Sequence, residues 1–146
     1  MIMLTKTQNS ELDNSMGRPK KIVAQSISAK TGVDIQTSMI LQYENAQALL
    51  YCGVANESDN QAKIGGTKGE ILLHGFWHNA QKVQLNQSGE ITQEDFSSLG
   101  IGYVPEIEEV NRCIALGKKE SELWSHKDAL ELSRMVEQVF EKIKEK

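Results

Sequence analysis

The sequence predicts an α+β domain in which five or six strands form a largely antiparallel open sheet, with helices on one face. Three observations support this fold class. Residues 17–99 contain short apolar stretches separated by turn-forming residues, a pattern typical of strands. Residues 103–146 have one proline, one glycine and apolar side chains at helical spacing. The connections between the expected strands are too short for parallel crossovers, which favours antiparallel pairing.

The expected strands follow one another through residues 17–99. Several of them alternate between apolar and polar residues, so one face of the sheet should pack and the other should be more polar. Residues 44–46 are expected to form a hairpin connection, and residues 87–90 a turn before Ile91. The strands are expected at Pro19–Ser28, Thr37–Tyr43, Gln47–Val54, Gln61–Ile64, Glu70–His74 and Lys82–Leu85.

Two helices are expected after the strands. Pro105 suits the first position of a helix, and Gly117 is a natural stop. Ser125 is the expected N-cap of the second helix, with Asp128 three residues later in a variant capping box. The apolar stripe of the first helix is Ile107, Val110 and Ile114. That of the second is Ala129, Leu132, Val136, Val139 and Ile143, widened by Leu130, Met135 and Phe140.

The length and composition indicate one domain and exclude several classes of protein. The 146 residues divide into an expected flexible leader, residues 1–16, and a domain at residues 17–146. The net charge of −4 gives no basic footprint for nucleic acid, and no apolar run suits a membrane helix. We find no secretory signal, which predicts a cytoplasmic location with reduced thiols. Cys52 and Cys113 are expected to be small buried side chains.

Several motifs suggest chemistry, but the residues favour structural interpretations. Gly65–Glu70 (GGTKGE) joins two apolar strands, which indicates a hairpin turn and not a phosphate-binding loop. His74 and His78 would lie some 13 Å apart on a strand, too far to share a metal ion. The acidic run Glu106, Glu108 and Glu109 is expected to be a solvated face. The residues alone therefore predict no metal site and no catalytic constellation.

Consecutive aromatic residues form the most interesting feature. Phe76 and Trp77 follow an expected strand and are bracketed by Gly75 and His78. Such a pair could project from a loop and wall an apolar pocket with a polar rim. Ordinary packing in the core or at an interface is the alternative interpretation, and both remain open from the residues alone.

Several segments, taken in their order and spacing across residues 17–146, resemble the C-terminal domain of the glucose–fructose oxidoreductase (Gfo/Idh/MocA) family, most closely its dihydrodiol dehydrogenase-like branch. No single segment is specific for this family, and the resemblance rests on the combination of the segments. The matching segments are GRPKKI at Gly17–Ile22, TGVD at Thr31–Asp34, MILQYENAQ at Met39–Gln47, IGGTKGEI at Ile64–Ile71, FWH at Phe76–His78 and YVPEIEEVNRCIALGKKES at Tyr103–Ser121.

The resemblance implies a two-part enzyme. An N-terminal Rossmann domain would hold NAD or NADP, and a C-terminal domain would wall the pocket for a sugar, polyol or diol and associate through its open sheet face. This chain has no G-x-G-x-x-G and no E-K-P motif, and residues 1–16 contain no His or Tyr for acid–base work. The resemblance therefore carries over no catalytic residue and no cofactor-binding residue. It carries over Phe76, Trp77 and His78 as candidates for the substrate pocket.

These observations lead to one main hypothesis. The chain is expected to be an isolated substrate-pocket and oligomerisation domain of an NAD(P)-dependent oxidoreductase, with no turnover of its own. A homodimer is expected through the sheet, centred either on Leu49 and Tyr51 or on the opposite-facing Leu50 and Cys52. The alternatives are a non-enzymatic binding or scaffold module and an enzyme completed by a separate Rossmann chain. The substrate and the choice between NAD and NADP stay open.

Overall fold

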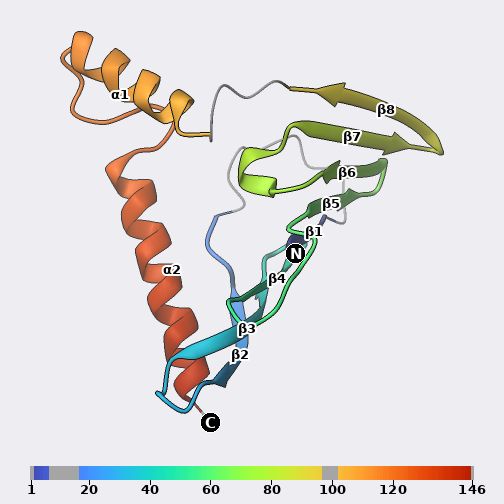
Figure 1. Cartoon of the computed structure of the whole chain (residues 1–146), viewed down its shortest axis with the longest axis vertical. Helices are drawn as coiled ribbons and strands as arrows, with labels where there is room; N and C mark the ends of the chain where they lie inside the picture. Colours follow the sequence, from blue (N-terminus) through green and yellow to red (C-terminus); the bar gives the residue numbers. More distant parts are fainter. Residues whose placement is uncertain (1, 7–16, 97–101, 146) are drawn as a thin grey trace.

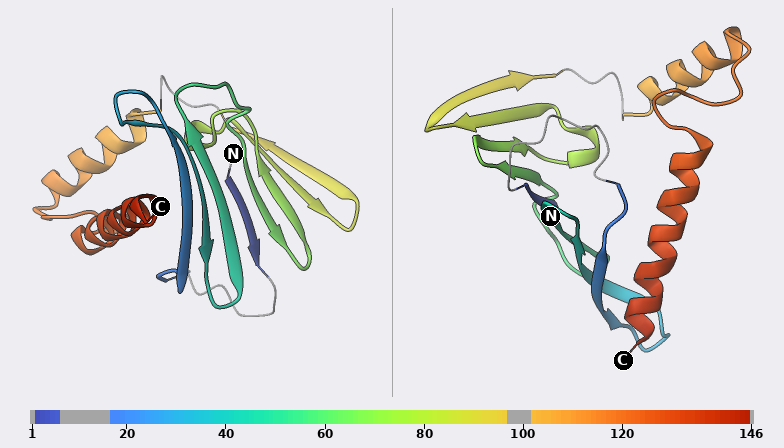
Figure 2. Two further views of the ribbon diagram at one scale, coloured as in Figure 1. Left: turned by 90° about the horizontal axis from the view of Figure 1, so that it is seen from below. Right: turned by 180° about the vertical axis from the view of Figure 1, so that it is seen from behind.

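The computed structural model describes residues 2–6, 17–96 and 102–145. These residues form two helices and one sheet of eight strands, with both helices on the same side of the sheet (Figures 1 and 2). The predicted α+β class is confirmed, and β1 and β8 add to the predicted strands. The elements are β1 (Ile2–Lys6), β2 (Lys21–Ser28), β3 (Asp34–Gln42), β4 (Ala46–Gly53), β5 (Ala62–Gly66), β6 (Gly69–Leu73), the 3₁₀ turn η1 (Trp77–Asn79), β7 (Lys82–Gln87), β8 (Glu90–Asp95), α1 (Val104–Ala115) and α2 (His126–Lys144).

The sheet consists of two antiparallel meanders joined by the N-terminal strand. The strand order is β2-β3-β4-β1-β5-β6-β7-β8. Strand β1 pairs antiparallel with β4 and parallel with β5, so Leu4 lies between Ala48 and Ile64 in register. The remaining neighbours pair antiparallel, as the short connections predict. The expected leader at residues 1–16 thus contains a paired strand at residues 2–6, while residues 7–16 lie outside the described residues.

The core lies where α2 crosses the β2–β4 meander. The alternating residues Ile22 and Ala24 of β2 are buried. They pack with Leu41 of β3, Ala48 of β4 and Val139 of α2. Figure 1 shows that α2 is nearest to the sheet at its C-terminal end, against β2 and β3, and diverges from the sheet toward its N-terminal end. Half-buried side chains surround this cluster, namely Met39, Tyr43, Leu50, Met135 and Ile143.

The divergence of α2 leaves part of its predicted apolar stripe uncovered. Leu132, Val136 and Phe140 are 45%, 45% and 47% exposed, whereas Val139 is 9% exposed. The stripe of the sequence therefore divides into a packed row and an exposed flank. The side of the sheet that α2 covers also continues in register onto β5–β7, where Ile64 and Leu85 are 39% and 38% exposed.

Local signals define the ends of both helices. The Ser125 hydroxyl accepts a hydrogen bond from the backbone N–H of Asp128, and the Asp128 carboxylate accepts one from the backbone N–H of Ser125, which confirms the capping box. Gly117 has φ +64°, and the N–H groups of Gly117 and Lys118 donate to the carbonyl oxygens of Ile114 and Cys113. This Schellman motif confirms Gly117 as the stop of α1. The helix begins at Val104, so that Pro105 occupies its second position.

The two cysteines differ in their surroundings. Cys113 is buried, as expected, but Cys52 is exposed. The prediction for Cys52 is wrong because the apolar face of β4 extends beyond the part of the sheet that α2 covers. Among the described residues, no helix is long and apolar enough to cross a membrane.

Candidate functional site

The aromatic segment forms a compact turn between β6 and β7. Gly75 has φ +69°, a left-handed conformation that lets the chain reverse directly after β6. The backbone N–H of His74 donates to the carbonyl oxygen of Lys82 at 3.1 Å and closes the hairpin. The backbone N–H of Asn79 donates to the carbonyl oxygen of Phe76 at 2.8 Å and forms the 3₁₀ turn. The predicted position of these aromatics in a loop is therefore confirmed.

The three candidate side chains lie together on this turn. The rings of Trp77 and His78 have centroids 5.5 Å apart and meet edge to face at 88°. The ring of Phe76 is tilted by 52° against that of His78, with centroids 5.8 Å apart. Phe76 is 62% exposed and Trp77 43% exposed, so solvent reaches both aromatic side chains. The imidazole of His78 between them adds a hydrogen-bonding group to an otherwise apolar platform.

One hydrogen bond and one close approach relate the turn to other parts of the chain. The backbone N–H of Trp77 donates to the carbonyl oxygen of Asn60 at 2.9 Å, which ties the turn to the residues before β5. A Cβ atom added at Gly102 would lie 3.1 Å from the side chain of Asn79, so the turn also approaches the residues that lead into α1. The aromatic turn thus lies close to two other parts of the chain and is joined to one of them by a backbone hydrogen bond.

The other motifs take structural roles. The segment Gly65–Glu70 is the tight turn between antiparallel β5 and β6, which confirms the predicted hairpin. The imidazole of His74 forms a 2.9 Å hydrogen bond between its Nε2 and Oε1 of Gln84 on β7, and His78 stacks on the aromatic turn. The structure therefore places the two histidines in different surroundings. Among the described residues, no three His, Cys, Asp or Glu side chains group as a metal site.

The acidic run at the start of α1 contains a polar network that the sequence interpretation missed. Glu109 accepts hydrogen bonds from Arg112 Nε at 2.7 Å and Nη2 at 2.8 Å, and also from the Ser121 hydroxyl and the Cys113 thiol. The bonds from Arg112 and Ser121 lower the pKa of Glu109 to about 2. Glu109 thus joins the α1–α2 connection to α1 through these hydrogen bonds. The prediction that the acidic run is a solvated face is wrong for this residue, whose side chain is 18% exposed. The i,i+3 spacing of Glu109 and Arg112 was the available signal.

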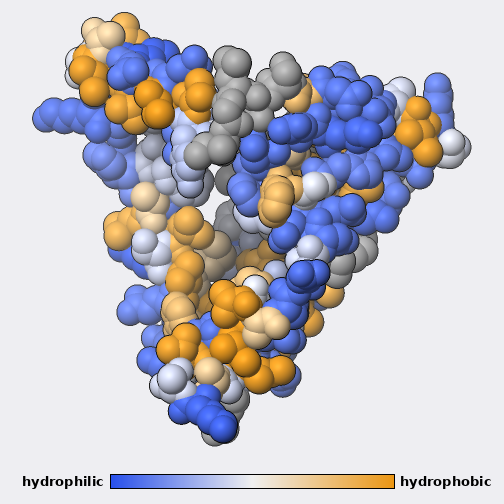
Figure 3. Space-filling model, in the orientation of Figure 1, coloured by the Kyte–Doolittle hydropathy of each residue, from blue (hydrophilic) through white to orange (hydrophobic). Residues whose placement is uncertain are grey.

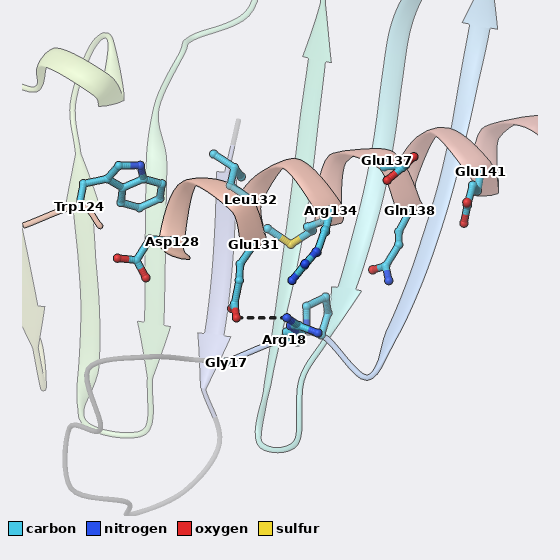
Figure 4. A pocket seen from close by; sticks show the side chains of 12 residues that line it. Gly17, Arg18, Trp124, Asp128, Glu131, Leu132, Arg134, Glu137, Gln138 and Glu141 are labelled. Carbon is cyan, nitrogen blue, oxygen red and sulfur yellow. Dashed lines mark hydrogen bonds and ion pairs between the residues drawn. The ribbon is translucent and has the colours of Figure 1, made fainter. Parts of the chain in front are cut away.

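A groove runs along α2 at some distance in sequence from the aromatic turn. Figure 4 shows Trp124, Asp128 and Glu131 lining this hollow of about 410 Å³ together with the segment at Gly17–Pro19. The guanidinium of Arg18 donates to Glu131 at 3.1 Å and holds that segment against α2. The sequence interpretation did not identify this groove, because its two walls lie more than a hundred residues apart in the chain.

The geometry of the aromatic turn is suited to binding a ligand. The aromatic turn supplies apolar faces and one imidazole, and it brings together the predicted residues Phe76, Trp77 and His78. Such a surface suits a ligand with apolar C–H faces and polar hydroxyl groups. The groups in the network of Glu109 are bonded to one another, so they serve the structure of α1.

Curated relatives match most of the chain. It is 30% identical over 135 residues to a trans-1,2-dihydrobenzene-1,2-diol dehydrogenase of Xenopus laevis, which covers 86% of this chain and 40% of the relative. It is 32% identical over 132 residues to the enzyme of the same name from Danio rerio, which covers 83% of this chain and 38% of the relative. The chain therefore spans less than half the length of these relatives. No family model matches the chain.

Solved structures share the fold at low sequence identity. An aldose–aldose oxidoreductase from Caulobacter crescentus matches with a TM-score of 0.73 and 12% identity, over 99% of this chain and 53% of that one. The UDP-N-acetylglucosamine 3-dehydrogenase GnnA from Acidithiobacillus ferrooxidans matches with a TM-score of 0.75 and 13% identity, over 97% of this chain and 52% of that one.

The fold and the matching relatives together define the C-terminal α+β part of an oxidoreductase. The chain belongs to the Gfo/Idh/MocA oxidoreductase family, and it corresponds to the C-terminal part of dihydrodiol dehydrogenases. The resemblance found in the sequence segments is thereby confirmed. The roles of Phe76, Trp77 and His78 stay predictions.

Proposed function

We propose that this chain forms the wall of a substrate pocket in an NAD(P)-dependent oxidoreductase for sugars, polyols or diols, and that it does not turn over substrate alone. The match to dihydrodiol dehydrogenases over 86% of the chain supports the class of substrate. The solved neighbours, an aldose–aldose oxidoreductase and a UDP-N-acetylglucosamine 3-dehydrogenase, act on sugar compounds by their names. A cytoplasmic location stays part of this proposal, and cell fractionation would test it.

The aromatic turn is the observation that carries the proposal. Trp77 and Phe76 expose ring faces on which the C–H face of a sugar or diol can stack. His78 stands against both rings, where its imidazole can exchange a hydrogen bond with a hydroxyl group. Because backbone hydrogen bonds fix the turn at Asn60 and within Phe76–Asn79, the platform exists before a ligand arrives.

Hydride transfer needs a nicotinamide held against the substrate, together with a proton partner within hydrogen-bond reach. The sequence contains neither the G-x-G-x-x-G fingerprint nor the E-K-P motif. We therefore assign cofactor binding to a Rossmann domain that would be linked to this chain or supplied by a separate one. The role of this chain is to position the substrate.

Self-association through the open sheet face is the second part of the proposal. Val23, Ile40 and Leu49 are cross-strand neighbours on β2, β3 and β4, and they are 42%, 37% and 37% exposed. Together with Tyr51 they line a shallow apolar hollow of about 520 Å³. Leu50 packs with the core on the opposite face. This arrangement favours Leu49 and Tyr51, and not Leu50 and Cys52, as the centre of a homodimer.

A fluorescence titration tests the substrate platform. In the Trp124→Phe variant, Trp77 is the remaining tryptophan, so trans-1,2-dihydrobenzene-1,2-diol should quench its emission saturably. The matched Trp77→Phe variant, which keeps Trp124, should show no saturable quenching. Quenching in the second variant and not in the first would overturn the assignment of the platform.

Turnover and cofactor binding are tested on the same protein. The chain alone should not oxidise the diol with NAD⁺ or NADP⁺, and NADH and NADPH should show no saturable binding by nicotinamide fluorescence. Reduction of either nucleotide by the purified chain would contradict the proposal. Sedimentation equilibrium tests the homodimer, since Leu49→Glu should dissociate it while Glu94→Gln on the exposed strand β8 should not.

A further inference from the structure

Asn60, two residues before β5, lies beside the aromatic turn. The antiparallel ladder of β5 and β6 ends at the pair Ala62 and Leu73, so the residues before β5 and those after β6 leave the sheet side by side. There the carbonyl oxygen of Asn60 accepts a hydrogen bond from the backbone N–H of Trp77 at 2.9 Å. The connection between β4 and β5 is therefore joined to the aromatic turn at one of the candidate residues themselves.

This hydrogen bond supplies an acceptor that the 3₁₀ turn η1 lacks. The first N–H groups of a helical turn have no partner within the turn. Phe76, the N-cap of η1, makes no side-chain hydrogen bond to them, and Trp77 is the first residue of η1. The acceptor for Trp77 instead comes from Asn60. The start of η1 is thus set by a different segment of the chain.

The backbone of Asn60 has a left-handed conformation. Its φ is +50°, which asparagine and glycine adopt more readily than other residues and which β-branched residues rarely adopt. The Ser58 hydroxyl donates to Oδ1 of Asn60 at 3.2 Å, and the backbone N–H of Gln61 donates to Oδ1 of Asp59 at 3.4 Å. These bonds lie on both sides of Asn60. The direction of its carbonyl group therefore depends on a conformation that this residue type tolerates.

The aromatic turn lies away from the apolar core. Figure 3 shows a mainly hydrophilic surface over β5–β8 on the face in view, whereas hydrophobic residues gather near the C-terminal end of α2. Phe76 and Trp77 are both exposed and lie outside the cluster of buried residues on β2–β4 and α2. A backbone hydrogen bond to the turn accordingly has a larger share in placing the Trp77 ring than it would have within a packed core.

We infer, on the basis of the proposed function, that Asn60 is a positioning residue for the substrate platform, because its left-handed backbone directs the carbonyl oxygen that holds Trp77. When residue 60 leaves this conformation, the carbonyl group turns away and Trp77 loses its acceptor. A smaller fraction of the molecules then carries the platform in its binding form, and the apparent affinity for a ligand falls in proportion to that fraction.

Tryptophan fluorescence without ligand tests this role. All variants are made in the Trp124→Phe background, where Trp77 is the remaining tryptophan. Asn60→Val places a β-branched residue in the left-handed conformation, so acrylamide quenching of Trp77 should rise about twofold as the turn opens locally. Asn60→Gly, which retains the conformation, should leave the quenching unchanged. Asn60→Ala, a milder change than valine, should lie between these two variants.

Ser88→Val is the matched control. Ser88 has φ +55° in the turn between β7 and β8, at the opposite end of β7 from η1, so valine imposes the same kind of strain away from Trp77. Quenching of Trp77 should not change in this variant. If Asn60→Val and Asn60→Ala leave the quenching unchanged, or if Ser88→Val raises it equally, Asn60 does not position Trp77.

Titration with trans-1,2-dihydrobenzene-1,2-diol separates this role from the proposed function. The apparent dissociation constant should rise about fivefold or more in Asn60→Val and should keep its original value in Asn60→Gly. Equal weakening in both variants would overturn the inference, because the asparagine side chain and not its backbone would then act on the site. If the diol quenches none of the proteins, including the one that retains Asn60, the proposed substrate platform fails, whereas the measurement without ligand still decides whether Asn60 positions Trp77.

Discussion

The two meanders of the sheet carry similar apolar patterns but differ in what covers them. On β2–β4, alternating residues such as Leu41 and Ala48 are 4% and 3% exposed, because the C-terminal turns of α2 lie on them. On β5–β7, Ile64 and Leu85 occupy the same side of the sheet and are 39% and 38% exposed. Alternation of apolar and polar residues therefore indicates which side chains share a face of the sheet, whereas the burial of that face depends on an element from elsewhere in the chain.

The largest expected effect comes from replacing one leucine by alanine in each of the two meanders and comparing the losses of stability. Leu41→Ala should lower the free energy of unfolding by about 2–4 kcal/mol, because it opens a cavity beneath α2. Leu85→Ala should cost less than about 1 kcal/mol, since water already reaches that side chain. Urea unfolding followed by circular dichroism gives both values. Equal losses would show that the β5–β8 meander is packed as tightly as β2–β4.

The second test concerns the start of α2, where the helix stands away from the sheet. Ser125→Ala removes the hydroxyl of the capping box and should cost about 1 kcal/mol of stability. The matched variant Ser133→Ala, inside the same helix, should be neutral or slightly stabilising because alanine favours helices. Thermal unfolding monitored at 222 nm distinguishes them. A neutral Ser125→Ala would mean that the N-terminal turn of α2 contributes little to the fold.

The third test uses pH, because hydrogen bonds to the ionised Glu109, and not burial of apolar side chains, hold the α1–α2 connection against α1. The pKa of Glu109 falls from 4.5 to about 2 in the folded chain. Because the pKa of Glu109 is lower in the folded chain than in the unfolded chain, its ionised carboxylate stabilises the fold at pH values above the unfolded pKa. This contribution is lost as the pH falls from about 5 toward 2. Glu109→Gln should therefore be less stable than the unchanged chain at pH 7, and the gap should close on acidification.

Urea unfolding at pH 7, 4 and 2.5 measures this gap. Glu108→Gln, which removes an exposed carboxylate one residue away, should keep the pH profile of the unchanged chain. A constant gap between Glu109→Gln and the unchanged chain across this range would contradict the role given to the network.

The smallest expected effect is that of the ion pair between Arg18 and Glu131. The two side chains are 65% and 35% exposed, so their attraction is largely screened by solvent. Arg18→Gln should lower the free energy of unfolding by less than about 1 kcal/mol, and added salt should reduce the difference further. A loss above 2 kcal/mol would show that the segment before β2 is a larger part of the packed region than its contacts indicate.

Signals that act over a few residues could be read from the sequence. The capping box at Ser125 and Asp128 and the glycine stop at Gly117 are complete within a few positions, and both were predicted. The alternation of β3 and β4 and the hairpin at Gly65–Glu70 belong to the same kind of evidence. The position of the aromatic turn also followed from its neighbours in the chain.

Features that depend on distant partners could not be read in this way. Strand β1 begins with three apolar residues that show no alternation, at the start of an otherwise polar segment, and its pairing with β4 and β5 is what defines it as a strand. Every residue of β8 is exposed, so the strand carries no apolar face to reveal it. Cys52 has the alternation of a buried residue, but α2 does not reach it. The groove beside Arg18 and Glu131 forms between segments whose proximity no local pattern encodes.

The placement of β1 has a consequence for how the chain reaches its final state. Residues 2–6 pair with β4 at residues 46–50 and with β5 at residues 62–65, which lie much further along the chain. Each meander can assemble from neighbouring hairpins, whereas insertion of β1 must close long loops and should be the slow event. Until that event, β4 and β5 would each present an unprotected edge to other chains. The interval before β1 pairs with β4 and β5 is thus when this chain is most prone to aggregate through its strand edges.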